Sequence, residues 1–429
     1  MSATTIAVVH ARAVYDSRGR PTVEAEVRLA GGAIGRGIAP AGASRGRHEA
    51  LDLRDGGSTC GGLGVARAIE NAKGPLARAI LGLDAADQAE VDRALIAADG
   101  TQNKARLGGN AIVALSLANL DAAARAAGLP TWAWLAQGRG VTLPMPEIQI
   151  FGGGAHAGRR VDIQDFMVVP VGASNFAQAL AMVAEVYRAA GETMAEAGKL
   201  AGVADEGGYW PLFATNDEAL DYVVRAIERA GFRPGAEVAI SLDVAASEFG
   251  RDGRYRLGLE GRELDSGGMI DLLADWLARY PIVSIEDPLA EDDAEGLVEF
   301  TRRFGGGVQI VGDDFLVTNA ERVVEAARRG ACNAALIKVN QAGTVTEAKA
   351  ALDAARAVGW GAIVSARSGE TEDVAIVHLA TGWAAGQLKV GSFARSERMA
   401  KWNEGLRVEE ALGNDAHFAG WPPAGIAGI

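Results

Sequence analysis

The sequence predicts an α/β fold with a β/α barrel in its C-terminal part, and three observations lead to this prediction. Short apolar runs recur between residues 238 and 391, and each ends in or near a charged residue. The runs are rich in Leu and β-branched residues, which is typical of strands buried on both faces. Helix-like segments such as 318–331 and 343–360 separate most of them. Strands that alternate with helices in this way typically close into a barrel.

Residues 1–140 are expected to form a small α+β domain ahead of the barrel. Two strand-like runs flank the turn-forming residues 16–21, which predicts a β-hairpin. Residues 35–50 are rich in Gly, Ala and Ser, so we expect a mobile loop there. The Ala-rich stretch 63–136 has helical spacing with Gly and Pro breaks, which predicts several packed helices.

Residues 141–429 are expected to form the barrel domain. Near its start, residues 152–170 begin with four glycines in seven positions, which predicts a flexible loop able to close over a ligand. Further on, Asp205 and Glu206 precede paired glycines and form an acidic site outside the strand series. Thr318 or Asn319 is expected to cap the helix-like segment that follows.

Composition narrows the class of protein and of partner. The 429 residues include 42 basic and 55 acidic ones, a net charge of −13. No Lys/Arg-rich run is present, so neither nucleic acid nor a membrane surface is an expected partner. Cys60 and Cys332 are the only cysteines, which favours a reducing compartment. No signal peptide or membrane span is apparent, and the cytoplasm is the expected location.

Three carboxylates at the ends of strand-like runs predict a metal site. Asp243, Glu286 and Asp313 each end a different run, and the C-terminal strand ends of a barrel carry its catalytic groups. Hard oxygen ligands from separate elements suit Mg2+. The alternative is that these are solvated loop acids, but three in the same strand-end position favour a metal.

Two lysines in apolar runs add a basic group to this site. Lys338 and Lys389 would be costly to bury without a partner. Each is either a structural ion pair with a neighbouring acid or a functional base or anion ligand. Together with Arg367 and Ser368 they supply a positive wall for a carboxylate or phosphate. A metal, a lysine and the loop acid Glu206 suit proton abstraction beside a carboxylate.

Seven strings together give the chain a resemblance to the enolase family over essentially its full length. They are VYDSRGRPTVE (14–24), ADEGG (204–208), SLDVAASEF (241–249), YPIVSIEDP (280–288), IKVNQAGT (337–344), RSGETED (367–373) and ARSER (394–398). The resemblance implies an N-terminal α+β domain and a C-terminal eight-unit β/α barrel. It also implies a small phosphorylated substrate, a homodimer or higher homo-oligomer, and two Mg2+ sites, one structural and one catalytic.

The resemblance also implies residue roles. Asp243, Glu286 and Asp313 would bind the structural Mg2+, and Ser44 the catalytic one. Lys338 would abstract the substrate proton. The other implied residues are Glu206 and Asp165 for departure of the hydroxyl, Lys389 for the carboxylate, Arg367 and Ser368 for the phosphate, and Gln164 and His156 near the substrate. On residue type alone, a lone histidine is more often a packing or surface residue.

Departures from the family pattern cluster around the expected site. Ala366 stands where the family has a histidine that contacts phosphate, and Asp165 where it has a glutamate beside Glu206. Losing one methylene retracts that carboxylate by about an ångström, which matters in a preorganised site. Two loops also gain arginines, namely Arg45, Arg47, Arg159 and Arg160. These guanidinium groups would suit a larger or more anionic partner; the alternative is neutral drift in a GC-rich genome.

The main hypothesis is a Mg2+-dependent enzyme that removes the C2 proton of 2-phosphoglycerate or a similar acid and forms an enolpyruvate product. The departures favour a diverged paralogue of the carboxyphosphonoenolpyruvate synthase type, which uses a nucleotide-activated phosphonate in phosphonate biosynthesis. The first alternative is an ordinary enolase that forms phosphoenolpyruvate. The second is a catalytically weak binding protein, against which the intact Lys338 and Glu206 argue.

Overall fold

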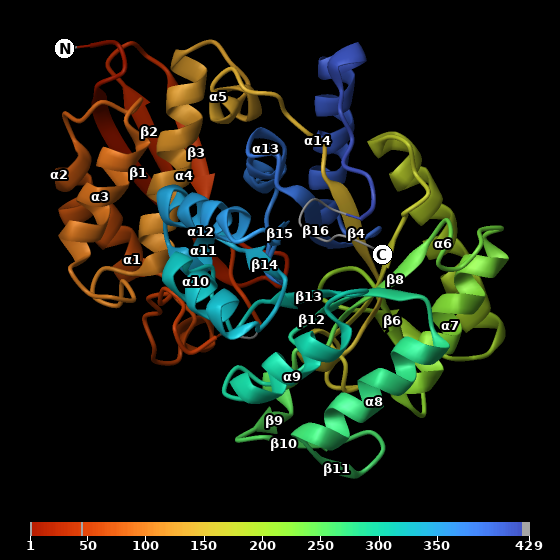
Figure 1. The fold of residues 1–429 in the computed structure, drawn as a ribbon. Helices are drawn as coiled ribbons and strands as arrows, with labels where there is room; N and C mark the ends of the chain where they lie inside the picture. Colours follow the sequence, from red (N-terminus) through yellow and green to blue (C-terminus); the bar gives the residue numbers. More distant parts are fainter. Residues whose placement is uncertain (1, 44–45, 423–429) are drawn as a thin grey trace.

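A computed structural model describes residues 2–43 and 46–422, and its N-terminal part contains a three-stranded antiparallel sheet (Figure 1). The strands are β1 (Ile6–Tyr15), β2 (Pro21–Leu29) and β3 (Ile34–Ile38), in the order β1-β2-β3. The predicted hairpin is confirmed, with Tyr15 paired to Pro21 across the turn. Asp16 closes this turn, because its Oδ1 accepts the backbone N–H groups of Arg18 and Arg20, both at 2.9 Å.

Helices pack beside this sheet, as the Ala-rich pattern predicted. They are η1 (Thr59–Gly62), α1 (Ala66–Asn71), η2 (Ala72–Leu76), α2 (Ala77–Ile80), α3 (Gln88–Asp99), α4 (Gly109–Ala126) and α5 (Thr131–Ala136). A Cβ atom on Gly37 would stand 2.5 Å from the Ala118 nitrogen of α4. The loop prediction for residues 35–50 is therefore wrong over residues 35–38, where glycine permits close packing of β3 on a helix.

Eight strands close into a barrel, which confirms the predicted fold class. They are β4 (Met145–Gly152), β5 (Asp165–Val169), β8 (Ala239–Asp243), β12 (Ile282–Glu286), β13 (Gln309–Gly312), β14 (Ala334–Ile337), β15 (Gly361–Ser365) and β16 (Gly386–Ser392). Neighbours in this order are hydrogen-bonded, and the pairing of β16 with β4 closes the ring.

The start of the barrel departs from a regular alternation of strand and helix. Only the short η3 (Gly154–Ala157) lies between β4 and β5, and β5 runs antiparallel to both β4 and β8. The predicted loop 152–170 is thus wrong in extent, since its last part is the buried strand β5. Because β5 is reversed, its first residue Asp165 pairs with Asp243, the last residue of β8. This places Asp165 at the barrel end that carries the predicted acids.

Helices surround the barrel, and small sheets extend from it (Figure 1). The helices are α6 (Phe176–Glu196), α7 (Asn216–Arg229), α8 (Ser266–Arg279), α9 (Ala294–Phe304), α10 (Ala320–Arg329), α11 (Val339–Ala342), α12 (Val345–Ala357), α13 (Ala375–Gly382) and α14 (Ser396–Leu412). The remaining elements are β6 (Leu200–Val203), β7 (Tyr209–Pro211), η4 (Ala246–Glu248), β9 (Gly250–Arg251), β10 (Arg254–Leu257), β11 (Arg262–Asp265) and η5 (Gly413–Asp415). The predicted cap is confirmed at Asn319, whose Oδ1 accepts the Arg322 N–H at 3.0 Å. No helix in the described part of the chain is long and apolar enough to cross a membrane.

The interior of the barrel holds a buried polar network that the sequence did not reveal. Gln387 Nε2 donates to Glu147 Oε1 at 2.6 Å and to Gln309 Oε1 at 3.1 Å. Ser284 Oγ donates to the same Gln309 oxygen at 3.0 Å. Burial raises the pKa of Glu147 to about 7. These bonds link β4, β12, β13 and β16 below the strand ends.

Candidate active site

The carboxyl ends of the barrel strands bring the predicted acids and lysines into one buried cluster. Asp243 and Glu286 are the last residues of β8 and β12, and Asp313 directly follows β13. Lys338 directly follows β14, and Lys389 lies in β16. All five side chains are buried. A cavity of about 20 Å³ at this cluster is lined by residues that include Asp243, Lys338, Lys389, His156, Gln164, Asp165, Glu206, Ala366, Arg367 and Ser368.

Both lysines form direct ion pairs with the clustered acids. Lys389 Nζ donates to Asp243 Oδ2 at 2.8 Å and to Glu286 Oε2 at 2.7 Å. Lys338 Nζ donates to Asp313 Oδ2. The sequence left open whether each lysine forms an ion pair with a neighbouring acid, and both of them do. Each lysine also lines the cavity, so pairing does not remove it from the cavity wall.

Burial and charge act against each other in this cluster. Burial alone would lower the pKa of Lys389, but the carboxylates of Asp243 and Glu286 outweigh it and hold that pKa well above its usual value. Burial, together with Asp243, raises the pKa of Glu286 far above its usual range. Burial would also raise the pKa of Asp313, but the ammonium of Lys338 lowers it. The single ammonium group of Lys389 thus pairs with two acids, Asp243 at the end of β8 and Glu286 at the end of β12.

A second group of titratable side chains faces the cavity from two loops and from the start of β5. His156 Nδ1 lies 3.0 Å from Asp165 Oδ1, and His156 Nε2 lies 3.8 Å from Glu206 Oε1. Gln149 links Asp165 to the turn that carries Glu206, because its Nε2 donates to Asp165 while its Oε1 accepts the Gly208 N–H at 2.8 Å. Asp165 Oδ2 also lies 3.7 Å from Lys389 Nζ. The shorter Asp165 side chain therefore still reaches the other cavity groups.

The environment of His156 favours its charged form. Burial would lower the pKa of this imidazole, but the carboxylates of Asp165 and Glu206 outweigh burial and raise the pKa to about 9. The same contact acts on Asp165, whose pKa falls to about 2 although burial opposes the change. At neutral pH the two side chains form an imidazolium–carboxylate pair, with both ring nitrogens protonated.

This pairing predicts a pH-dependent contribution of His156 to stability. Its folded pKa of about 9 exceeds the usual 6.5, so the contribution is fully present below pH 6.5 and is lost as pH rises through 9. The difference of about 2.5 pH units corresponds to roughly 3 kcal/mol at most. We therefore expect the free energy of unfolding, measured in urea, to fall between pH 6.5 and pH 9.5 in the native chain. The fall should be smaller in His156→Gln. His10→Gln, at an exposed histidine of β1, is the matched control; an unchanged pH slope in His156→Gln would remove this role.

Two buried oxygen atoms near the strand ends suit a divalent cation. Glu286 Oε1 and Gln164 Oε1 are buried and have no hydrogen-bond partner among the described residues. A buried oxygen without a donor is costly, and Mg2+ takes oxygen ligands of this kind. Within the described residues, Asp243, Glu286 and Asp313 do not place ligand atoms within 4.8 Å of one another, and Lys389 bridges the first two.

Asp287 and Asp314 are buried acids that the sequence interpretation missed. Their carboxylate oxygens and one of Asp313 lie within 4.8 Å of one another. Asp287 Oδ1 accepts the Asp313 N–H at 2.9 Å, and its Oδ2 accepts the Asp314 N–H at 2.8 Å. Asp287 therefore fixes the backbone that carries Asp313. The sequence did contain a signal for Asp287, because it directly follows Glu286 and a second acid at a strand end faces the same loops.

Arg367 is held in place by a residue from the first loop. Its Nη1 donates to Glu49 Oε2 and to Asn340 Oδ1, both at 3.0 Å. Burial would lower the pKa of Arg367, but Glu49 outweighs it and raises the pKa. The neighbouring Ser368 Oγ accepts from Arg18 Nη1 at 3.1 Å. Arg367 and Ser368 thus line the cavity, and they are held by Glu49 and Arg18, which the sequence had not indicated.

The additional arginines lie apart from the small cavity. Arg47 pairs with Glu291 at 3.0 Å and with Asp292 at 3.2 Å. Arg159 pairs with Glu248 at 3.2 Å, and Arg160 lies over the ring of Trp210, 5.8 Å from its centroid. Ser44 and Arg45 lie outside the described residues. Over the ranges 2–43 and 46–422, none of the loop arginines lines the cavity at the strand ends.

Comparisons with known proteins agree with this architecture. The family model described as "Enolase, N-terminal domain" matches residues 6–135, and that described as "Enolase, C-terminal TIM barrel domain" matches residues 140–424. The curated Enolase of Rubrobacter xylanophilus is 49% identical over 418 residues, which is 97% of each chain.

Proposed function

The chain belongs to the enolase family of carbon–oxygen lyases, and from this premise we propose that it dehydrates 2-phosphoglycerate to phosphoenolpyruvate. The observation that carries the proposal is the cavity lined by both Lys338 and Glu206. A base and an acid at one cavity are what removal of a C2 proton and a C3 hydroxyl requires. Cytoplasmic location and assembly into homodimers remain predictions.

Lys338 is assigned the role of base. It takes the C2 proton on Nζ, and the electron pair of the broken C–H bond forms the enediolate. To act as a base the lysine must first lose a proton, which its bond to Asp313 opposes by raising its pKa against the effect of burial. Any rearrangement that draws the Asp313 carboxylate away removes the largest of the effects that oppose burial and so lowers that pKa.

Glu206 is assigned the role of acid. It gives a proton to the C3 hydroxyl, which leaves as water while the C2–C3 double bond forms. The imidazolium of His156, 3.8 Å from Glu206, adds positive charge where the hydroxyl departs. Asp165 fixes the orientation of that ring through its 3.0 Å contact with Nδ1.

Binding of the substrate is assigned to the cationic part of the cavity. Arg367 and Ser368 would contact the phosphate, and Lys389 the carboxylate. Ala366, whose N–H donates to the Lys389 carbonyl oxygen at 2.8 Å, offers the phosphate no side-chain donor. Asp243, Glu286 and Asp313 would hold a structural Mg2+ and Ser44 a catalytic one. Bound Mg2+ supplies positive charge that neutralises the substrate carboxylate and the enediolate.

The ordinary reaction is favoured over the phosphonate hypothesis. A relative at 49% identity over nearly the whole chain is a curated Enolase. Of the loop arginines that motivated a second anionic substrate, Arg47 pairs with Glu291 and Arg159 with Glu248.

Ultraviolet absorbance of phosphoenolpyruvate tests the proposal. Purified protein with Mg2+ and 2-phosphoglycerate alone should form the product, and a chelator should stop the reaction. A strict requirement for a nucleotide-activated phosphonate would overturn the proposal in favour of the diverged reaction.

Mg2+ is also expected to stabilise the fold through the strand-end carboxylates. A ligand at 100 times its dissociation constant adds about 2.7 kcal/mol to the free energy of unfolding. We expect Mg2+ to raise the melting temperature of the native chain and to have little effect on Glu286→Gln, each compared with its own metal-free form. Glu299→Gln, at an exposed ion pair on α9, is the matched control. A full Mg2+ shift in Glu286→Gln would exclude Glu286 as a ligand.

A further inference from the structure

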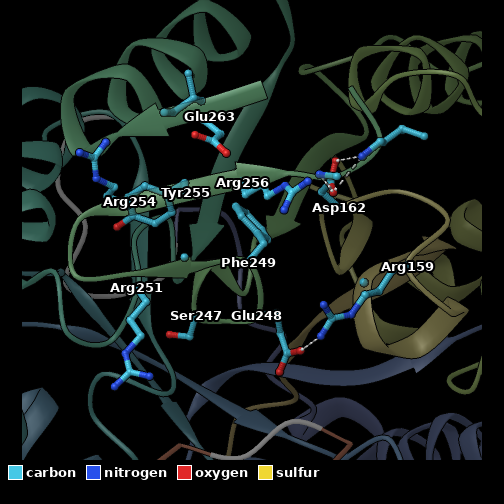
Figure 2. Close-up of a pocket in the computed structure, with 15 residues that line it drawn as sticks. Arg159, Asp162, Ser247, Glu248, Phe249, Arg251, Arg254, Tyr255, Arg256 and Glu263 are labelled. Atoms are coloured by element: carbon cyan, nitrogen blue, oxygen red, sulfur yellow. Dashed lines mark hydrogen bonds and ion pairs between the residues drawn. The ribbon is translucent and has the colours of Figure 1, made fainter. Parts of the chain in front are cut away.

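A second, larger cavity lies between the loop that joins β4 to β5 and the small sheet of β9, β10 and β11 (Figure 2). Its volume is about 710 Å³, within the usual range of small-molecule sites. It shares no lining residue with the 20 Å³ cavity at the strand ends. The proposed dehydration makes no use of it.

Apolar side chains form one part of this cavity. Phe249, Leu259 and Leu264 line it and are only partly buried, so each exposes apolar surface there. The ring of Tyr255 packs against Phe249 with centroids 6.3 Å apart. The Tyr255 hydroxyl donates a hydrogen bond to Asp293 Oδ2 at 2.7 Å. Tyr255 therefore contributes its ring to the cavity wall. A planar apolar group would cover this surface.

Four arginines surround the apolar part, as Figure 2 shows for Arg159, Arg251, Arg254 and Arg256. Arg254 and Arg256 alternate with buried residues along β10, so both lie on its exposed side. Among the residues that the structure describes, neither guanidinium group has a hydrogen bond or ion pair. Within the described ranges, the Arg251 guanidinium has a single ion pair, an exposed contact at 3.6 Å with Asp252, its neighbour in sequence.

The acids that line the cavity neutralise these arginines incompletely. Asp162 is engaged with the Gly258 N–H at 2.7 Å and with Asn216 Nδ2 at 2.9 Å. Glu248 is engaged with Arg159 at 3.2 Å. Glu263 is the only other acid that lines the cavity in the described part of the chain. The four arginines and three acids that line the cavity therefore leave a net charge of +1 there, on a chain whose net charge is −13.

We propose that this cavity binds a phosphorylated ligand with a planar apolar group, of the chemical class of a nucleoside diphosphate. The planar group covers Phe249 and the two leucines. The guanidinium groups of Arg254 and Arg256 bind the phosphates, for which their planar forks are suited.

Calorimetric titration of the full chain tests the proposal with ADP, pyrophosphate and adenosine as probes, in low salt and without Mg2+. ADP should bind at least about tenfold more tightly than either fragment, because each fragment uses only half of the cavity. Absence of ADP binding overturns the proposal. Equal binding of pyrophosphate overturns the role of the apolar surface, and equal binding of adenosine overturns that of the arginines.

The double variant Arg254→Ala/Arg256→Ala assigns the binding to this cavity. It should weaken ADP binding at least about tenfold, since the charged hydrogen bonds from both guanidinium groups to the phosphates are lost. Arg262→Ala is the matched control, because this exposed arginine lies on the neighbouring β11 outside the cavity and pairs with Glu260. It should change the affinity less than twofold. Unchanged ADP affinity in the double variant places the ligand elsewhere and overturns the proposal.

Discussion

Replacing Lys338 with arginine should lower the rate of C2 proton removal by about 10²- to 10⁴-fold, the usual contribution of a general base. Arginine keeps the positive charge and can still pair with Asp313, but it does not lose its proton in proteins. The variant therefore separates the base from the ion pair. Lys338→Ala should lose the rate as well, and it should also lose stability because it leaves the buried Asp313 carboxylate without its ammonium partner.

Exchange of the C2 proton of 2-phosphoglycerate with solvent deuterium, followed by NMR, measures this step. Lys349→Arg is the matched control, since Lys349 pairs with Asp353 on the surface of α12. Thermal melting shows whether the Lys338→Arg fold is retained. Native exchange rates in a folded Lys338→Arg protein would restrict Lys338 to a structural role.

Replacing Glu206 with glutamine should separate the two halves of the reaction. Glutamine cannot give a proton to the departing hydroxyl, so formation of phosphoenolpyruvate should fall by about 10²- to 10⁴-fold. Removal of the C2 proton should continue, because Lys338 and its contact with Asp313 are untouched. The native chain should form product, whereas Glu206→Gln should mainly exchange deuterium into its substrate.

Asp205→Asn is the matched control for Glu206→Gln. Asp205 is the adjacent acid, it is only partly buried, and it does not line the cavity at the strand ends. Its replacement should leave both rates close to native. Equal losses of exchange and of product formation in Glu206→Gln would show that this residue supports proton abstraction too, and would overturn the division of roles.

The strand-end acids could be predicted because the barrel geometry follows from local patterns. Each buried run ends where its apolar residues end, and parallel strands then gather those ends at one rim. Asp243 and Glu286 lie at that rim as predicted, and Asp313 lies one residue beyond its strand. The cap at Asn319 could be read for the same reason, since it depends on residues three positions apart.

Other parts of the site depend on contacts that no local pattern specifies. The reversed direction of β5 brings Asp165 to the rim, yet a buried apolar run has the same appearance in either direction. Glu49 meets Arg367 across the interface between the first loop and the barrel, a pairing of residues far apart in sequence. Gln149 joins Asp165 to the turn that carries Glu206, and its residue type alone gave no indication of this.

The loop arginines show the limit of reading charge from sequence. A cationic loop side chain is attracted by whichever acids lie near it in the fold. Arg47 meets acids at residues 291 and 292, and Arg159 meets Glu248. These acids lie far away in the chain, so the sequence alone could not show which charge each arginine would contact. Arg159 contributes instead to the rim of the larger cavity.

The most direct test of the proposed function is a single NMR time course of the native protein with Mg2+ and 2-phosphoglycerate in D2O. We expect loss of the C2 proton signal together with growth of the vinyl signals of phosphoenolpyruvate. Loss of the C2 signal without vinyl signals would contradict the assignment of an acid at Glu206 for this substrate. An unchanged spectrum would contradict the dehydration itself.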